Sequence, residues 1–291
     1  NTAVMVAGEQ VWALWEAGSP LALSASDLST RNFVTLRDDL KGMPFQAHPR
    51  YAPDGSIWNV GSAGGQAVIW HLRPDRSLSD AQVVPLPRAS YMHDFTATDR
   101  HVILVLQPWV FATHAMPVTA GLTWRPEMGT QVLVLDKDDL SKRRLYELPG
   151  FFHFHLGDAW AERDGTIRFD VAASGDPRFA VDGAQVLVDG HGVVPGDPAK
   201  LALITLRPDG RADMTYSDVV GEFPKADPRR AGLKRSLTAH TSGETRGRPL
   251  PTGLAVHDWD SGRSHAFEFG VHQVVEEAVF VPKPGATAET D

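Results

Sequence analysis

Cysteine is absent from the 291 residues of the chain, and positive charge is scarce. Without cysteine there is no disulfide, no thiolate ligand for a metal and no cysteine nucleophile, a composition compatible with a reducing compartment. The 28 basic residues are outnumbered by 36 acidic ones, which gives a formal net charge of −8. Proteins that are held by phosphates carry a concentrated excess of Lys and Arg. The charge therefore argues against binding to nucleic acid or to an anionic membrane surface.

Long apolar runs and helical patterns are also lacking. The apolar stretches fall far short of the ~20 residues needed to span a bilayer, and no window of a dozen residues shows a convincing helical stripe with caps at both ends. Hydrophobic residues make up 42% of the chain, as in folded proteins, and the 26 glycines and 21 prolines indicate many tight turns. This composition favours an all-β fold. We expect a cytoplasmic location, and because the chain begins at Asn1 rather than Met, a leader could precede it.

Short alternating segments follow Asp-Gly turns, which is the signature of β-hairpins. Residues 53–60 and 164–171 show it clearly, and 208–216 more loosely. A second repeated unit consists of an apolar strand, an acidic turn and another strand, at 132–148 and more weakly at 21–36. Further strands are predicted at 101–106, 201–206, 254–258, 264–269 and 277–282.

Many short strands with weak self-similarity and no strong helix favour a β-propeller. At about 40–45 residues per blade, and with two long loops at 107–128 and 172–200 set aside, the chain supplies about five blades. The first loop is rich in apolar side chains such as Trp109, Met116 and Trp124. Because solvated connections are usually polar, this loop either roofs an apolar ligand pocket or packs on the core.

Histidine supplies most of the reactive chemistry in this sequence. Of the twelve histidines, three lie near predicted strand ends with aromatic or apolar neighbours: His48, His93 and His155. Neutral imidazoles brought from separate strands suit Fe, Zn, Cu or Ni. From residue pattern alone, each is more readily explained as a hydrogen-bonded, partly buried histidine.

Six segments, in the same order, resemble the carotenoid cleavage oxygenase family, nonheme-iron enzymes that cut conjugated or stilbene-type double bonds. They are residues 13–18, Ala47-His48-Pro49, Met92-His93-Asp94-Phe95, 154–160, Gly221-Glu222-Phe223-Pro224 and 277–282. One tripeptide is a weak match, whereas six matches in order across nearly the whole chain are specific. The resemblance implies a seven-bladed β-propeller. Residues 1–291 would supply about five of its blades as a single partial oxygenase domain, with long apolar loops capping one face.

Carried onto this sequence, the resemblance implies that His48, His93 and His155 bind Fe(2+). It also implies that three glutamates orient the imidazoles: Glu16, Glu222 and Glu277. The physical reason is that a metal-bound imidazole usually donates its other N–H to an oxygen acceptor. Each glutamate could otherwise be a solvated or salt-bridged residue.

Three further residues in or near these motifs need interpretation. His153 lies two residues before His155, which on a strand places both on one face, but the family pattern selects His155 as the ligand. His257 precedes a hairpin turn and is interpreted as a surface strand residue. Asp158 stands where the family commonly has Asn, and it either adds a charge near the iron or points away.

Members of the family that the chain resembles bind iron with four histidines, and the fourth is expected near the C-terminus of the propeller. Residues 283–291 contain no histidine, and family members normally carry a further stretch before the point that matches Asn1. We therefore expect that the chain lacks both ends and that the fourth ligand lies outside it.

The function that the resemblance implies is an Fe(II)-dependent dioxygenase. It would use O2 to cleave a conjugated C=C bond of an apolar carotenoid or apocarotenoid, with no catalytic residue beyond the metal centre and with peripheral membrane contact as a way to collect substrate. The Tyr and Lys with which stilbene-cleaving members engage a phenol are not evident. The alternatives are a lignostilbene-type dioxygenase, an isomerohydrolase with the same metal site, a three-histidine zinc hydrolase and a non-catalytic propeller that binds partners.

Overall fold

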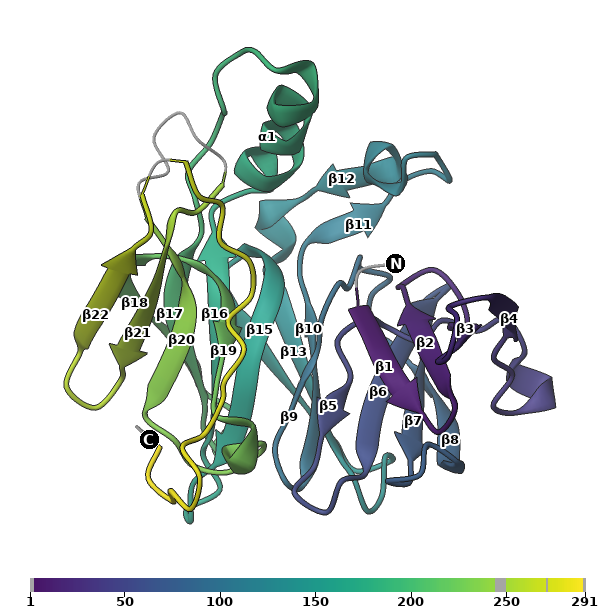
Figure 1. Ribbon diagram of the computed structural model, residues 1–291. Helices are drawn as coiled ribbons and strands as arrows, with labels where there is room; N and C mark the ends of the chain where they lie inside the picture. The colour runs from purple at the N-terminus through teal and green to yellow at the C-terminus, as the bar shows by residue number, and fades with distance from the viewer. Residues whose placement is uncertain (1–2, 244–249, 271, 290–291) are drawn as a thin grey trace.

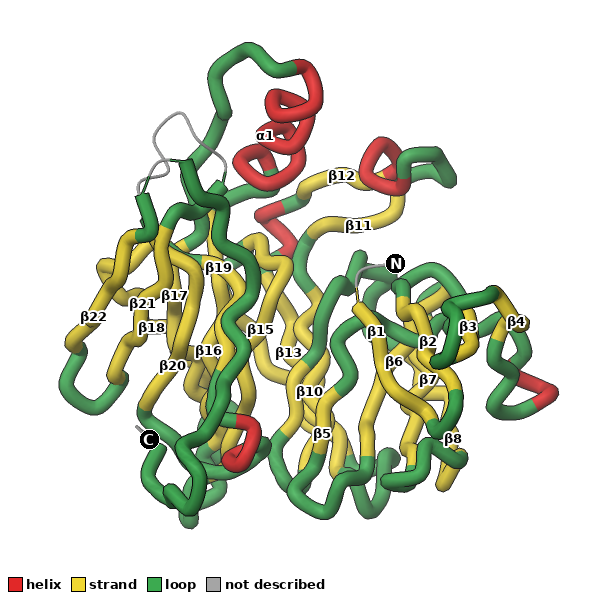
Figure 2. The backbone as a smooth tube through the Cα atoms, in the orientation of Figure 1, coloured by secondary structure: helices red, strands yellow, loops and turns green. Residues whose placement is uncertain are grey.

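The computed structural model describes residues 3–243, 250–270 and 272–289. Within these residues the chain forms five four-stranded antiparallel sheets, which follow one another along the sequence, and one two-stranded hairpin (Figure 1). Helices are few and lie outside the sheets (Figure 2). The predicted all-β architecture with about five propeller-like blades is confirmed, while the total of seven blades stays a prediction.

Each sheet is a meander of neighbouring strands. The first sheet contains β1 (Ala3–Ala7), β2 (Gln10–Leu14), β3 (Leu21–Ser24) and β4 (Thr30–Phe33). The second contains β5 (Arg50–Tyr51), β6 (Ile57–Ala63), β7 (Gln66–Leu72) and β8 (Leu78–Pro85). The third contains β9 (Thr96–Ala97), β10 (His101–Leu106), β13 (Thr130–Asp136) and β14 (Arg143–Leu148). The fourth contains β15 (Phe152–Ala161), β16 (Ile167–Ser174), β17 (Lys200–Leu206) and β18 (Ala212–Val220). The fifth contains β19 (Glu222–Lys225), β20 (Leu237–Ser242), β21 (Gly253–Asp258) and β22 (Arg263–Glu268).

The Asp-Gly turns join neighbouring strands of a sheet, as their sequence predicts. Gly55 connects β5 to β6, Gly165 connects β15 to β16, and Gly210 connects β17 to β18. All three glycines have φ between 81° and 90°, a left-handed conformation that glycine adopts without steric cost. The chemistry of these turns therefore fixes three of the hairpins.

Apolar cores lie between successive sheets. Leu14 and Trp70 belong to the core between the first and second sheets, and Val60 and Leu104 to the core between the second and third. The third and fourth sheets share a core that includes Phe169. Because a strand between two cores is buried on both faces, β10 is a continuous apolar run after its first residue.

The junction of the fourth and fifth sheets contains a buried ion pair. Arg235 donates to Asp170 at 2.6 Å, and both side chains are fully buried. Arg235 also donates to the carbonyl of Asp158, and its guanidinium lies over the ring of Trp160. The neighbouring Gly157 has no room for a side chain, because an added Cβ would overlap the Asp170 carboxylate. Charge pairing and close approach therefore join these two sheets.

One α-helix contradicts the expectation that residues 172–200 form a loop without helical pattern. Helix α1 spans Arg178–Asp189 and ends at Gly190, whose φ is 71°. Its start carries no side-chain cap, and Gly183 interrupts the helix, which weakened the signal. Ala180, Ala184 and Leu187 nevertheless have helical spacing and line one cavity. No described helix is long and apolar enough to cross a bilayer.

The other long loop, 107–128, folds partly into a hairpin. Strands β11 (Trp109–Phe111) and β12 (Leu122–Trp124) pair with each other, and two short 3₁₀ helices flank β12, η2 (Val118–Gly121) and η3 (Pro126–Met128). Trp109 is buried against Phe152 and Phe154. The hairpin and α1 project from the same end of the molecule, at the top of Figure 1.

Two predicted strands differ from the structure. The strand expected at 33–36 ends at Phe33, because β4 (Thr30–Phe33) pairs earlier with β3. Residues 277–282 form no strand, although their composition is typical of one. A strand needs a partner backbone, and within the described residues this segment runs beside β19 (Figure 1) without ladder pairing to it. The remaining 3₁₀ helices are η1 (Asp38–Leu40) and η4 (Pro228–Arg230).

Candidate metal centre

Three histidines enter one site from three different sheets. His48 lies just before β5, His93 lies before β9, and His155 is part of β15. Strand β15 contacts both β9 and β19. The meander topology therefore brings side chains that are 45 and 62 residues apart in sequence into contact.

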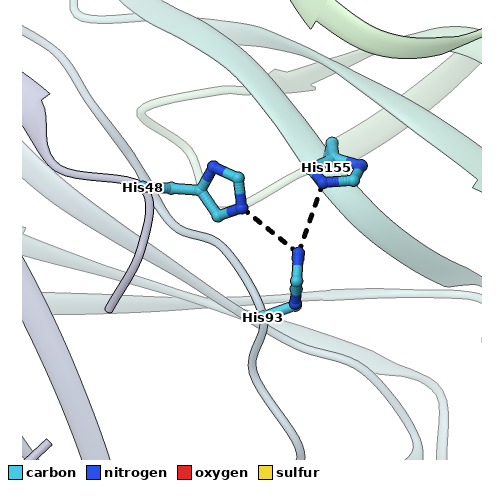
Figure 3. A group of neighbouring side chains, drawn as sticks. All are labelled: His48, His93 and His155. Atoms are coloured by element: carbon cyan, nitrogen blue, oxygen red, sulfur yellow. Dashed lines mark hydrogen bonds between the residues drawn. The ribbon is translucent and has the colours of Figure 1, made fainter. Parts of the chain in front are cut away.

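The three imidazoles point their Nε2 atoms toward a common point (Figure 3). The Nε2 atom of His93 lies 3.2 Å from that of His48 and 3.3 Å from that of His155. One potential ligand atom from each histidine lies within 4.8 Å of the others. Nitrogens that share a transition metal at about 2.0–2.1 Å stand roughly 3.0–3.4 Å apart, so the spacing fits a metal.

Two carboxylates fix the tautomers of this site. Glu16 Oε1 lies 2.6 Å from Nδ1 of His93, and Glu222 Oε2 lies 2.7 Å from Nδ1 of His155. A neutral imidazole that donates from Nδ1 has only a lone pair on Nε2. The Nε2 atoms of His93 and His155 then face each other as two acceptors. A shared cation resolves this repulsion, so the donor set fits a metal that prefers imidazole nitrogen.

Burial and charge act in opposite directions on these groups. Burial lowers the pKa of His48 to about 4, which keeps its imidazole neutral. Burial would lower the pKa of His155 too, but the Glu222 carboxylate outweighs it and raises that pKa. For Glu16, burial raises the pKa, but the hydrogen bond and charge of His93, together with weaker contributions from the Glu16 backbone and His48, lower it overall. Glu16 is therefore an anion at neutral pH.

Glu277 lies close to the site without contacting a histidine among the described residues. It lines a polar cavity of about 210 Å³ together with His48 and His155, and its carboxylate pairs with Lys225 Nζ at 2.7 Å. Burial raises its pKa, but the hydrogen bond and charge of Lys225 lower it overall. The role predicted for Glu277 in orienting an imidazole stays a prediction.

Arg50 connects the three histidine segments, a feature that sequence reasoning missed. Its guanidinium donates to both oxygens of Asp94 at 2.8 Å and to Asp158 at 3.0 Å. It also donates to the carbonyls of Phe95 and Leu156. Asp94 in turn accepts from the backbone N–H of Leu156. Each charged residue lies one to three positions from a histidine of the site, which was the available signal.

One guanidinium pairs with two carboxylates in this cluster. Burial raises the pKa of Asp94, but Arg50, the neighbouring histidines and the backbone N–H of Leu156 together outweigh it and lower that pKa to about 2. The Asp158 carboxylate pairs with Arg50 at 3.0 Å. The cluster therefore positions the backbone of the three histidine segments.

His153 and His257 lie outside the site. The ladder between β15 and β16 is irregular after His153, so the simple two-residue alternation to His155 does not hold. The His153 ring is buried and packs near Phe151. The interpretation of His257 as a surface residue is wrong, because it is 3% exposed, packs against Trp259 and bonds to Ser264. Inward-facing alternation on β21 outweighs its proximity to a turn.

A second, apolar cavity of about 260 Å³ also adjoins the site, separate from the polar cavity that Glu277 lines. Its wall includes His155, Glu222 and Phe154 from the region of the site and Phe179 and Leu187 from α1. The hairpin β11–β12 does not line it, but packs against Phe152 and Phe154, which do. The loop 107–128 thus supports the wall of a cavity instead of forming its roof.

Fold and site together define a β-propeller-like protein with a three-histidine site that is suited to a metal ion. The family model described as retinal pigment epithelial membrane protein matches residues 1–291. The chain belongs to this family, and the resemblance to carotenoid cleavage oxygenases read from the motifs is confirmed.

Individual relatives agree with the family. The chain is 27% identical to the apocarotenoid-15,15'-oxygenase of Synechocystis over 318 residues, which cover 100% of this chain and 62% of that protein. It is 22% identical to resveratrol cleavage oxygenase 1 of Aspergillus fumigatus over 325 residues, covering 100% of this chain and 64% of that one. The chain thus spans just under two thirds of the length of these relatives.

Solved structures share the fold. A cobalt-substituted apocarotenoid oxygenase from Synechocystis matches with a TM-score of 0.87 at 22% identity, and the match covers 100% of this chain and 64% of that one. At this identity the likeness is one of architecture.

Proposed function

We propose that the chain is the metal-binding part of an Fe(II)-dependent dioxygenase that cleaves a conjugated C=C bond of a carotenoid or apocarotenoid. The observation that carries the proposal is the convergence of three Nε2 atoms, two of them on imidazoles held by carboxylates, beside an apolar cavity. When bound, Fe(II) supplies the redox chemistry by which O2 adds one oxygen atom to each carbon of the double bond, giving two carbonyl products.

The protein's part is to hold ligands and exclude water. His48, His93 and His155 would hold the metal as neutral ligands and leave its charge uncompensated within the site. Glu16 and Glu222 accept hydrogen bonds from Nδ1–H and so keep the Nε2 lone pairs directed inward. The apolar wall by His155 excludes water and orients a long hydrocarbon, which is how a protein steers chemistry that belongs to its cofactor.

The composition of the apolar cavity favours a hydrocarbon over a phenol. Its described wall contains neither Tyr nor Lys, and its few hydroxyls come from Ser174, Thr241 and Ser242. The ionisable groups in the wall, His155 and Glu222, are already bonded to each other, so a phenol hydroxyl would find no tyrosine or lysine partner there. The carotenoid class therefore suits the cavity better than the stilbene class.

Exposed apolar side chains support peripheral contact with a membrane as a route for an insoluble substrate. Met116 is 86% exposed in the loop between β11 and β12, and Val188 is 82% exposed on α1. Both elements project from the same end of the molecule (Figure 1). Exposed residues of this kind near an apolar cavity are typical of proteins that bind at a lipid surface.

The test is cleavage of an apocarotenoid aldehyde by the Fe(II)-reconstituted protein under ¹⁸O₂. The proposal predicts two carbonyl products that carry the label and no turnover without O2. Equal turnover under nitrogen would instead indicate an isomerohydrolase. Activity with Zn(II) and without O2 would indicate a hydrolase.

A further inference from the structure

Two cavities of opposite character meet at the metal site, and their described walls share only His155 and Phe223. The apolar cavity, about 260 Å³, continues from these two residues toward α1. The polar cavity, about 210 Å³, continues toward Arg50, Asp94 and the Lys225–Glu277 pair. The two rings therefore form the boundary between an apolar and a polar compartment.

Phe223 is placed at this boundary by an unusual backbone. Its φ is +55°, a left-handed conformation that a bulky residue rarely adopts. Pro224 follows it, and the residue before a proline favours extended backbone, so local preference does not explain this geometry. Such conformations persist where surrounding contacts over-determine them, and they concentrate at functional sites.

The surrounding contacts do over-determine Phe223. Its backbone N–H donates to Glu222 Oε2 at 2.7 Å, the same oxygen that accepts from His155. The carbonyl of Glu222 accepts from Thr241 Oγ1 at 3.0 Å. The left-handed turn thus directs the Glu222 carboxylate to His155 and brings the Phe223 ring beside the same imidazole, with 4.3 Å between ring centroids and 37° between ring planes.

We propose that Phe223 is a positioning residue that separates the two compartments, keeping water in the polar cavity away from the apolar side of the metal site and supporting the His155 ring. This rests on the proposed function only in taking the apolar cavity as the side on which substrate binds. The separation itself is a property of the chain without metal. A dry apolar side strengthens electrostatic interactions at the site and protects a hydrocarbon substrate from side reactions.

The test compares Phe223→Gly with Phe223→Leu in the metal-free protein. Glycine adopts φ +55° without strain, so F223G removes the ring and leaves the backbone favourable, whereas F223L retains an apolar wall. The probe is Nile red, a neutral dye whose emission shifts to the red when water reaches it. A further variant, Ala184→Phe, fills the apolar cavity from α1 and identifies the emission that comes from dye bound there.

The relevant signal is the emission that A184F removes, which comes from dye bound in the apolar cavity. The proposal predicts that this emission is blue-shifted in the wild type and in F223L, and that it shifts to the red in F223G. Emission in F223G as blue as in the wild type would overturn it, provided that circular dichroism shows the same fold. Metal binding is measured separately by titration with Co(II). A wild type that binds no Co(II) would refute the proposed function, and the dye measurement would still decide the role of Phe223.

Discussion

Glu222 illustrates how single residues prepare the site. Its Oε2 atom lies 2.7 Å from Nδ1 of His155, and in the proposed function this contact directs the Nε2 lone pair inward. In the sequence, the resemblance carried by Gly221-Glu222-Phe223-Pro224 implied this residue, and an unpaired carboxylate would be costly if buried there. The motif gave no indication of the left-handed backbone at Phe223, which depends on contacts with β20.

The variant Glu222→Gln is expected to weaken metal binding about 10- to 100-fold, because an amide orients the imidazole less strongly than a carboxylate. Isothermal titration with Co(II) measures the change. Glu127→Gln is the matched control. The Glu127 side chain is 66% exposed and pairs with Arg125, outside the site. Equal affinity of E222Q and wild type would contradict the role given to Glu222.

Lys137 provides a pH-dependent prediction. Its ammonium donates to the carbonyl of Thr98 and lies over Trp58, and burial lowers its pKa to about 8. Below pH 8 both the folded and the unfolded chain are protonated at this residue, and the buried charge destabilises the fold. Between pH 8 and the unfolded pKa near 10.4, the unfolded chain binds more protons, so the free energy of unfolding rises with pH.

Comparison with Lys137→Met isolates this effect. The free energy of unfolding of the wild type, relative to K137M, is expected to rise by roughly 2 kcal/mol between pH 7.5 and pH 10. Urea unfolding at a series of pH values measures the difference. A relative stability that falls or stays constant over this range would show that the ammonium is not destabilised by burial.

At the scale of elements, the cluster of Arg50, Asp94 and Asp158 connects loops from the second and third sheets to β15. Replacing Arg50 by Met leaves the buried Asp94 carboxylate without its partner. We expect a loss of about 3 kcal/mol in the free energy of unfolding, together with weaker Co(II) binding, because the histidine segments lose their common anchor.

The control for R50M is Arg211→Met, which breaks the exposed pair with Asp209 and is expected to change the free energy of unfolding little, because solvent screens exposed pairs. Urea unfolding and metal titration of both variants give the comparison. Similar losses in R50M and R211M would argue that the buried cluster has no special role.

Most of the strands were predicted from the sequence, and the elements that were predicted wrongly have identifiable physical causes. The strand at 101–106 agrees with β10 (His101–Leu106) residue for residue, because a run buried on both faces has an unambiguous pattern. Helix α1 was missed because Gly183 and the uncapped start at Pro177 hide its spacing. The segment 277–282 has strand composition without a partner strand, which composition cannot reveal.

At the scale of the whole molecule, the order of the sheets could be predicted but their meeting point could not. Motifs placed His48, His93 and His155 near strand ends. The packing of β15 against β9 brings His155 to His93, and their Nε2 atoms meet that of His48 in space. The charged cluster around Arg50 likewise forms where β5, β15 and the segment before β9 meet in space, so no local sequence pattern predicts it.

The exposed apolar residues near α1 predict binding to membranes. Val188→Glu is expected to lower the partition of the protein into neutral phosphatidylcholine vesicles by about tenfold or more, because an apolar side chain that enters the lipid contributes roughly 1.5–3 kcal/mol. Val279→Glu is the matched control, since Val279 is equally exposed, at 85%, but lies in the C-terminal segment. Vesicle sedimentation measures both, and equal partition of the two variants would exclude α1 as the contact.

The central claim is that three imidazoles hold one iron, and metal content tests it most directly. We expect about one iron per chain after anaerobic reconstitution with Fe(II), with a high-spin signal of the nitric oxide adduct in electron paramagnetic resonance. Both should disappear in His93→Ala and persist in His114→Ala, because His114 is exposed and lies outside the site. Iron retained in H93A at the wild-type level would contradict the account.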